Sequence, residues 1–448
     1  MKVTQYSTNK YGEMTAYGLR PAVYMSGAVR AKIDRARPNK GFLGLGVAIT
    51  GSSCYDLWQM ESEERHAFLQ SIYGKDGLGL CIGRLSVGSS DYSAELYSYD
   101  DVAGDTALEH FSIERDEEYI IPVIKEIIEI NPHIRLFSSP WSPPGWMKTG
   151  GSMCGGYMRE EYIDCYADYY VKFLKAYAEH GIKIFALTPQ NEPETDQGGR
   201  MPACIWHPDI EARFISVLRA KLDKAGLDTQ IWMHDHNFSG KGRVDWCLEN
   251  YPALPRDCGG IAFHYYDGAI EDTAFLREKY PDLSLHFSEG GPRLYDNYDS
   301  DWCKWGTMIC KVLSCGYSSF TGWNLMLDET GGPNIGPFFC GGLVTRYRDG
   351  SALEYSGQYK AFKHFGRVGE AGAVSYPVEL GGGGDRIHVY PSYPRPVVGA
   401  FCERADKSAS LVLVNQGSEK SQVQFEYGGE LWYIELLPDT LATVTFEE

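Results

Sequence analysis

Two glutamates stand directly after apolar, strand-like runs in this chain of 448 residues. Glu192 lies in the string Pro-Gln-Asn-Glu-Pro behind the run 182–187, and Glu289 lies in the string Phe-Ser-Glu-Gly-Gly at the end of the run 283–287. A residue just past a buried parallel strand emerges at the carboxyl end of that strand, so we expect both carboxylates at one end of a sheet. Two carboxylates about 5 Å apart suit retaining glycoside hydrolysis, because one can donate a proton while the other attacks the sugar.

Eight strand-like runs alternate with helix-like stretches from about residue 42 onward. The runs cover 42–49, 79–87, 134–140, 182–187, 230–234, 261–265, 283–287 and 319–325. The clearest helical patterns, at 117–130, 160–179 and 208–225, repeat apolar residues at intervals of three and four and end at Asn-Pro or Gly. Strand followed by helix, eight times, predicts an α/β fold of the parallel (β/α)₈ TIM-barrel type. An open doubly wound sheet is the alternative. Such a fold usually carries a glycine-rich nucleotide-binding loop after its first strand, but here Gly44 and Gly46 are not followed by a third glycine at the required spacing.

The two ends of the chain have a different pattern from the middle. After the glycines at 381–384 come short alternating strands with turn signals, at 387–390, 397–402, 409–414, 422–427, 431–437 and 442–446. These predict a β-sandwich. Residues 1–40 are also strand-rich and are expected to pair into it. We therefore predict a catalytic barrel over 41–370 and a side β-sandwich formed from both chain ends, 1–40 with 371–448.

The composition excludes several classes of partner. A net charge of -18 argues against nucleic acid and against an anionic membrane, since both select basic surfaces. No run reaches the roughly 18 apolar residues of a membrane span, and the first residues lack the apolar core of a signal peptide. The 12 cysteines are spread singly, which is typical of reduced thiols. We expect a cytoplasmic protein without a membrane partner, and nothing in the sequence indicates its oligomeric state.

Strings at the strand ends together resemble glycoside hydrolase family 30, which includes the acid β-glucosidases (glucosylceramidases). They are Arg-Leu-Ser at 84–86, Asp-Tyr-Ser at 91–93, Ser-Pro-Trp-Ser-Pro-Pro-Gly-Trp-Met-Lys at 139–148, Thr-Pro-Gln-Asn-Glu at 188–192, Ile-Ala-Phe-His-Tyr-Tyr at 261–266, Phe-Ser-Glu-Gly at 287–290 and Gly-Trp-Asn-Leu at 322–325. The resemblance implies a retaining barrel enzyme with a side β-sandwich, a carbohydrate substrate and no cofactor.

The resemblance also implies catalytic and sugar-binding roles. Glu192 is expected to be the acid/base and Glu289 the nucleophile. Asn191 matches an asparagine that holds the 2-hydroxyl of the sugar, and Asp91 matches a carboxylate that holds hydroxyls on its nonreducing side. Arg84 matches a buried arginine that keeps the nucleophile ionised, as a neighbouring cation does.

Four further residues are expected around these groups. Trp141 and Trp323 match the walls of the sugar pocket, and His264 and Tyr266 match partners of the carboxylates. Each of these four also has a purely structural interpretation, as barrel filling or as a satisfied core group.

The string His-Asp-His-Asn at 234–237 offers an alternative chemistry. Regular strand alternation puts His234 and His236 on one face, as in a zinc pair. No third ligand is placed by spacing, and retaining hydrolysis needs no metal, so we expect none. Glu194 is a second carboxylate close to Glu192, but it follows Pro193 and is expected to point to solvent.

The sequence thus predicts a retaining β-glycosidase that acts from the chain end on small soluble β-glucosides. A β-xylosidase, a β-1,6-glucanase of the same family and a non-catalytic carbohydrate-binding protein are the alternatives. The stretch 335–339 departs from the polar stretch that the glucosylceramidases carry at this place, so the exact sugar and aglycone stay open.

Overall fold

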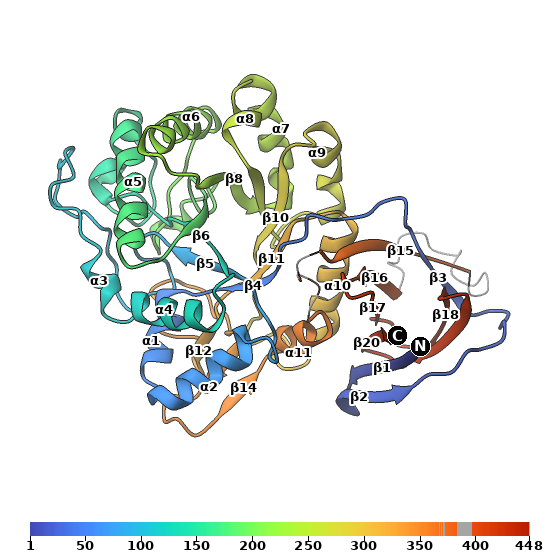
Figure 1. Ribbon diagram of the computed structural model, residues 1–448. Helices are drawn as coiled ribbons and strands as arrows, with labels where there is room; N and C mark the ends of the chain where they lie inside the picture. Colours follow the sequence, from blue (N-terminus) through green and yellow to red (C-terminus); the bar gives the residue numbers. More distant parts are fainter. Residues whose placement is uncertain (367, 369, 371, 383–396, 448) are drawn as a thin grey trace. The chain divides into compact units, whose positions relative to one another are not determined.

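The computed structural model describes residues 1–366, 368, 370, 372–382 and 397–447 (Figure 1). By contacts the chain divides into two compact units. One holds 46–295 and 319–354, and the other holds 1–45, 296–318 and 355–448. The predicted strand at 387–390 lies outside the described residues.

Eight parallel strands close into a barrel, which confirms the predicted (β/α)₈ fold (Figure 1). In chain order they are β4 (Gly44–Ala48), β5 (Ile82–Ser86), β6 (Arg135–Ser139), β7 (Ile184–Leu187), β8 (Gln230–Asn237), β9 (Gly260–His264), β10 (Ser284–Glu289) and β11 (Ser319–Gly322). Each lies within or overlaps one of the eight predicted runs. Their carboxyl ends therefore meet at one face, where the candidate residues were expected.

Eleven helices occur among the described residues. They are α1 (Gly51–Trp58), α2 (Ser62–Tyr73), α3 (Glu114–Glu117), α4 (Ile120–Ile130), α5 (Ile163–Glu179), α6 (Pro208–Ala225), α7 (Lys241–Asn250), α8 (Leu254–Asp257), α9 (Ala274–Lys279), α10 (Trp302–Ser314) and α11 (Gly357–His364). The three predicted helical patterns fall on α4, α5 and α6. Helix α6 has the clearest boundaries: proline occupies its first turn, and Gly226 ends it in the left-handed conformation at φ 69°.

Single 3₁₀ turns occur in several loops. They are η1 (Gly145–Met147), η2 (Thr149–Gly151), η3 (Glu160–Tyr162), η4 (Gln197–Gly199), η5 (Phe238–Gly240) and η6 (Ile270–Thr273).

A small sheet of β12 (Met326–Asp328), β13 (Val344–Arg346) and β14 (Leu353–Tyr355) was not predicted. The last predicted barrel run, 319–325, ends early at Gly322. Asn324 adopts φ 57°, a left-handed conformation that a continuous strand does not contain, and the chain resumes as β12 after this turn.

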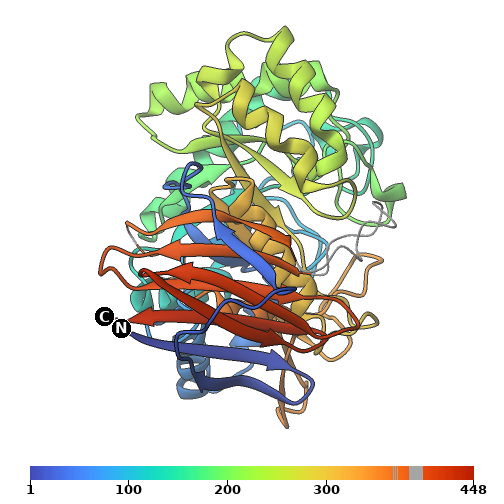
Figure 2. The same cartoon turned by 90° about the vertical axis from the view of Figure 1, so that its right-hand side faces the viewer.

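The second unit carries one nine-stranded sheet made from both chain ends, as predicted. Its order is β19 (Glu430–Leu436), β18 (Ser421–Tyr427), β3 (Val29–Ile33), β15 (Val374–Gly382), β16 (Val397–Glu403), β17 (Ala409–Asn415), β20 (Thr440–Glu447), β1 (Lys2–Asn9) and β2 (Gly12–Gly18). The first and last strands pair directly, with Lys2 opposite Glu447 (Figure 2).

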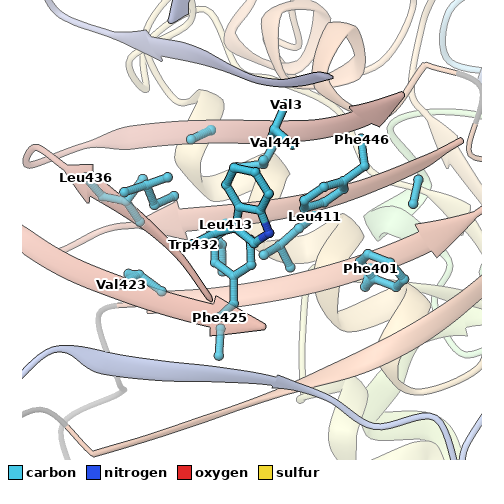
Figure 3. Close-up of a cluster of buried hydrophobic side chains, with 14 of the residues drawn as sticks. Val3, Phe401, Leu411, Leu413, Val423, Phe425, Trp432, Leu436, Val444 and Phe446 are labelled. Atoms are coloured by element: carbon cyan, nitrogen blue, oxygen red, sulfur yellow. The ribbon is translucent and has the colours of Figure 1, made fainter. Parts of the chain in front are cut away.

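Strand β15 lets this sheet curl over its own core. Its first half pairs with β16 and its second half with β3, so it passes from one layer to the other. One cluster of buried side chains draws on both layers, with Phe401 from one and Phe425 and Trp432 from the other (Figure 3). The predicted sandwich is therefore a single curled sheet with an apolar interior.

Each of the 12 cysteines is a free thiol. Among the described residues, none of the helices combines the length and the apolar character that a bilayer crossing requires.

Candidate active site

The two glutamates come together at the carboxyl end of the barrel. Glu289 is the last residue of β10, and Glu192 follows β7 by five residues. One carboxylate oxygen of each lies within 4.8 Å of the other and of a ring nitrogen of His264. This separation leaves room for an anomeric carbon between the carboxylates but none for an intervening water and sugar ring together.

Glu289 is held by a cation on one oxygen and a phenol on the other. The buried guanidinium of Arg84, from β5, donates through Nη1 to Oε2 of Glu289 and to the carbonyl oxygen of Ser288, the latter at 3.3 Å. The hydroxyl of Tyr266 donates to Oε1 at 2.9 Å. Both oxygens are thus fixed in direction, and the charge of the carboxylate is balanced by Arg84.

Asp235, which was not predicted as a site residue, is the centre of the buried hydrogen-bond network. It is fully buried and accepts five bonds. The donors are Arg84 Nη2 at 2.9 Å, Ser139 Oγ at 2.7 Å, Thr188 Oγ1 at 2.8 Å, His264 Nε2 at 3.0 Å and Ser288 Oγ at 2.6 Å. Burial opposes its ionisation, but Arg84 and the donated bonds outweigh burial and hold the pKa of this carboxyl well below its usual range.

A bulge in β8 explains why Asp235 reaches the barrel centre. His234 and Asp235 have φ values of 78° and 52°, and the pairing of β8 with β9 shifts between His234 and His236. The regular strand alternation assumed for the two histidines is therefore broken, although their rings still lie with centroids 6.0 Å apart. The ring of His234 packs on Phe263, whereas the ring of His236 reaches the glutamates.

Glu192 is surrounded by three nitrogen groups. Its Oε1 lies 3.3 Å from Nδ1 of His264 and 4.0 Å from Nε2 of His236, and its Oε2 accepts from the Gln197 amide at 2.6 Å. Gln197 and His236 were not predicted as site residues. Burial opposes the ionisation of Glu192, but the hydrogen bond and charge of His264 lower the pKa of this carboxyl.

Glu194 was expected to point to solvent, but its carboxylate contacts His236 instead. Its side chain is 36% exposed, yet its Oε2 lies 3.2 Å from Nδ1 of His236. That hydrogen bond lowers the pKa of Glu194 to about 2. His236 is thereby placed between two carboxylates, Glu194 on one side and Glu192 on the other.

His264 holds a proton next to Glu192. Burial disfavours its charged form, but the charge of Glu289 and the bonds to Asp235 and Glu192 raise the pKa of His264 to about 9. At neutral pH the His264–Glu192 pair therefore holds one proton, on the imidazole. The predicted acid role of Glu192 requires this proton to move across the 3.3 Å contact to the carboxylate.

The raised pKa of His264 predicts a pH-dependent stability. The folded state binds this proton more tightly than the unfolded chain, whose histidine pKa is near 6.5. The stabilisation of the folded state by protonated His264 is therefore complete below pH 6.5 and is lost as the pH rises through about 9. We expect the free energy of unfolding in urea to fall more steeply over this window in the wild type than in His264→Gln. His133→Gln, at an exposed histidine, should keep the wild-type dependence of the unfolding free energy on pH. Equal dependence in all three proteins would contradict a raised pKa at His264.

Seven of the predicted site residues line one pocket of about 340 Å³. They are Asp91, Trp141, Asn191, Glu192, Tyr266, Glu289 and Trp323. Arg84 and His264 lie beneath them in contact with the glutamates. The structure thus brings all nine predicted site residues together, and the roles given to them stay predictions.

The pocket walls have features that suit a sugar. The rings of Trp141 and Trp323 stack with centroids 5.1 Å apart, and the guanidinium of Arg84 lies 4.9 Å from the Trp141 ring. Asp91 is buried, and its Oδ1 has no hydrogen-bond partner among the described residues. Asn191 accepts from Arg84 at 2.8 Å, so its amide hydrogens remain to be offered to a ligand. An acceptor and a donor are thus available for sugar hydroxyls.

The group Glu192, His264 and Glu289 also has ligand atoms close enough for a metal ion. Both nitrogens of His264 already contact carboxylates, and Arg84 already pairs with Glu289. A metal cation at this place would have to compete with the arginine, so these residues fit an ion pair better than a metal site.

Comparisons with known proteins agree with this geometry. Residues 42–365 match the family model described as the glycosyl hydrolase family 30 TIM-barrel domain. The chain is 27% identical over 408 residues to putative glucosylceramidase 4 of Caenorhabditis elegans, covering 85% of this chain and 77% of that one. It is 27% identical over 407 residues to the lysosomal acid glucosylceramidase of Mus musculus, covering 86% and 77%. A solved endo-β1,6-glucanase superposes over 100% of both chains with a TM-score of 0.85 and 26% identity.

Proposed function

The chain belongs to glycoside hydrolase family 30, and from this premise we propose that it hydrolyses β-glucosides by a retaining, double-displacement mechanism. The observation that carries the proposal is the separation of the glutamate oxygens, within 4.8 Å. Retaining enzymes hold their carboxyl groups roughly 5–5.5 Å apart, whereas inverting enzymes hold them about 6.5–9.5 Å apart.

In the first step Glu289 attacks the anomeric carbon while Glu192 protonates the glycosidic oxygen. A bond forms between Glu289 and the sugar, the glycosidic bond breaks, and the leaving group departs with the proton. In the second step Glu192 takes a proton from water, which attacks the same carbon and releases Glu289. His264 recovers the proton from Glu192, since the two are in contact at 3.3 Å.

The product should retain the β configuration. Each displacement inverts the anomeric carbon, so two displacements restore the starting anomer. Proton NMR of the first sugar released from a nitrophenyl β-glucoside measures this directly, before mutarotation. Early accumulation of the α anomer contradicts the mechanism.

Action from the nonreducing end is supported by the loop beyond Asp91. The backbone N–H of Ile335 donates to the Asp91 carbonyl at 2.8 Å. A Cβ placed on Gly336 would lie 2.8 Å from the Asp91 Cβ, so the loop packs closely against this residue. The side of the pocket next to Asp91 is therefore covered, which favours an end-acting glycosidase over an enzyme with a long groove.

A second candidate is an endo-β-1,6-glucanase, because the solved enzyme of that name superposes on the whole chain. A substrate panel distinguishes the two: nitrophenyl β-glucoside and β-xyloside, β-linked glucose disaccharides, a long β-1,6-glucan and glucosylceramide in vesicles. We expect the small glucosides to be cleaved fastest. Faster cleavage inside the polymer indicates the glucanase, activation by lipid indicates a true glucosylceramidase, and no turnover indicates a binding protein.

A further inference from the structure

Lys148 is a buried cation that the proposed mechanism does not use. It is 1% exposed, and no carboxylate forms an ion pair with it in the part of the chain that the structure describes. Instead its ammonium group donates to Ser142 Oγ at 2.8 Å and to the backbone carbonyls of Met153 at 2.7 Å and Ala203 at 2.6 Å. Three N–H groups thus meet three acceptors. The cost of burying a cation without a paired carboxylate must be offset by what these bonds hold in place.

The three acceptors lie on two loops at the carboxyl end of the barrel. Ser142 and Met153 belong to the loop between β6 and α5, and Ala203 belongs to the loop between β7 and α6. The N–H of Ala203 also donates to the Met153 carbonyl at 3.2 Å, so this carbonyl accepts from the backbone of the second loop and from Lys148. One buried nitrogen atom therefore joins the two loops.

Each of these loops carries one residue of the same pocket wall. Trp141 directly precedes Ser142, and Met201 precedes Ala203 by two residues. The side chains of Trp141 and Met201 belong to one buried cluster with Trp323, and all three residues line the pocket of the glutamates. Because the wall is made from two loops, its shape depends on the contacts that hold one loop against the other.

Resting on the proposed function, we propose that Lys148 is a positioning residue for substrate binding, which holds Trp141 and Met201 in the arrangement that the sugar ring packs against. The residues that line the pocket do not include Lys148, so it acts through the two loops and not on the substrate. A neutral amine has two N–H groups and a lone pair for the same three oxygens. Loss of the proton therefore breaks one of the three bonds and leaves a lone pair facing an oxygen.

The proton on Lys148 is lost within a pH range that is open to assay. Burial lowers the pKa of Lys148 to about 8, and the surrounding titratable groups, the thiols of Cys154 and Cys204 and the carboxylate of Asp196, oppose this shift only in part. Burial raises the pKa of both thiols, to about 12 for Cys204, so neither thiol becomes charged while Lys148 titrates. The pH dependence of the contact between the loops should therefore follow Lys148.

The pH dependence of KM on nitrophenyl β-glucoside tests this role. In the wild type we expect KM to rise about 10-fold through a midpoint near pH 8, whereas the change in kcat follows His264, near pH 9. In Lys148→Met, which has no proton to lose, KM should already be about 10-fold high near pH 6.5 and should not change through pH 8, while kcat near pH 6.5 stays within about 3-fold of the wild type.

The matched control is Lys175→Met, at an exposed lysine in α5, which should keep the wild-type KM at every pH. The proposal is overturned if KM of Lys148→Met equals that of the wild type near pH 6.5 or still rises through pH 8. A loss confined to kcat overturns it as well, because a group that only shapes the binding wall acts on KM.

Hydrogen exchange of the wild type separates this inference from the proposed function, because it requires neither turnover nor a variant that folds. The Ala203 and Ile205 amides donate across the two loops, to the carbonyls of Met153 and Gly156. After correction for the intrinsic exchange rate, their protection should fall about 10-fold as the pH rises through 8, whereas amides inside α5 keep theirs. Constant protection refutes the role of Lys148 even if the wild type cleaves nitrophenyl β-glucoside. If protection falls but no β-glucoside is cleaved, the glycosidase is refuted and the joining of the loops by Lys148 stands.

Discussion

Glu289→Gln is expected to lower kcat on nitrophenyl β-glucoside by about 10⁴-fold or more. The amide has the shape of the carboxylate but cannot form the glycosyl ester on which both displacements depend. Its oxygen can still accept from Arg84 and its nitrogen can face the Tyr266 hydroxyl, so the local network keeps its hydrogen bonds. Initial rates under saturating substrate measure the loss, and thermal unfolding checks that the fold persists.

The control for this variant is Glu63→Gln, at an exposed position in the first turn of α2. It removes the same charge far from the pocket and should keep the wild-type rate. If Glu289→Gln retains even a tenth of the wild-type kcat, Glu289 is not the nucleophile.

The buried charges around these glutamates suit the transition state as well as the ground state. Arg84 and the protonated His264 supply two cations, and Asp235, Glu192 and Glu289 supply three carboxylates. The cluster is therefore left with one negative charge, next to the place where the sugar develops positive, oxocarbenium-like charge in the proposed mechanism. Asp235 matters in this balance because it fixes Arg84 and His264 together, although it lies beneath the pocket.

The barrel and the candidate site could be predicted together because the carboxyl ends of all eight strands lie at the same face of the barrel. Each parallel strand is an apolar run buried on both faces, so the eight runs are visible in the sequence, and the residue that follows each run must lie on the catalytic face. This is why Glu192 and Glu289 were found from the pattern alone, whereas Arg84 and His264, which lie within the runs 79–87 and 261–265, were found through the resemblance to the family. The unpredicted strand β15 contains Pro377 and ends in glycines, both of which weaken a strand pattern.

The residues that were missed depend on geometry that a regular pattern does not contain. Asp235, His236 and Asn237 reach the site through a bulge with left-handed backbone, whereas sequence alternation assumes an unbroken strand. Gln197 sits on a loop turn at φ 51°, and its contact with Glu192 depends on that turn. A short string with a histidine on each side of an aspartate, just past a buried run, was the available signal for Asp235.

Three aromatic residues that line the pocket, Tyr295, Phe338 and Phe339, were not predicted, for a different reason. Tyr295 and the pair Phe338–Phe339 are brought together by hydrogen bonds between two loops that are about 45 residues apart in the chain. Neither loop has a period, and exposed aromatics in a loop carry no sequence signal of their own. The pairing of Arg293 with Cys340 and the shared pocket lining become visible in the folded chain alone.

Glu192→Ala is expected to lose activity in proportion to the basicity of the leaving group. Nitrophenolate departs without a proton, so its release should fall much less than that of an alkyl or sugar alkoxide, which should fall about 10²–10⁴-fold. The second displacement also loses its base, so water attacks the glycosyl ester slowly and the ester accumulates. Rates on a series of β-glucosides with graded leaving groups measure the first effect, and a burst of nitrophenol measures the second.

Azide supplies the decisive comparison for Glu192. It is a small anion that needs no base, it fits the space left by the removed carboxylate, and its attack on the glycosyl ester regenerates Glu289 and forms a β-glucosyl azide. Added azide should therefore raise the nitrophenol rate of Glu192→Ala, with the azide product visible by NMR. Glu194→Ala removes the neighbouring carboxylate, which contacts His236 rather than the reacting groups, and should give no azide product. Equal losses on good and poor leaving groups in Glu192→Ala, without azide product, would assign the acid/base to another residue.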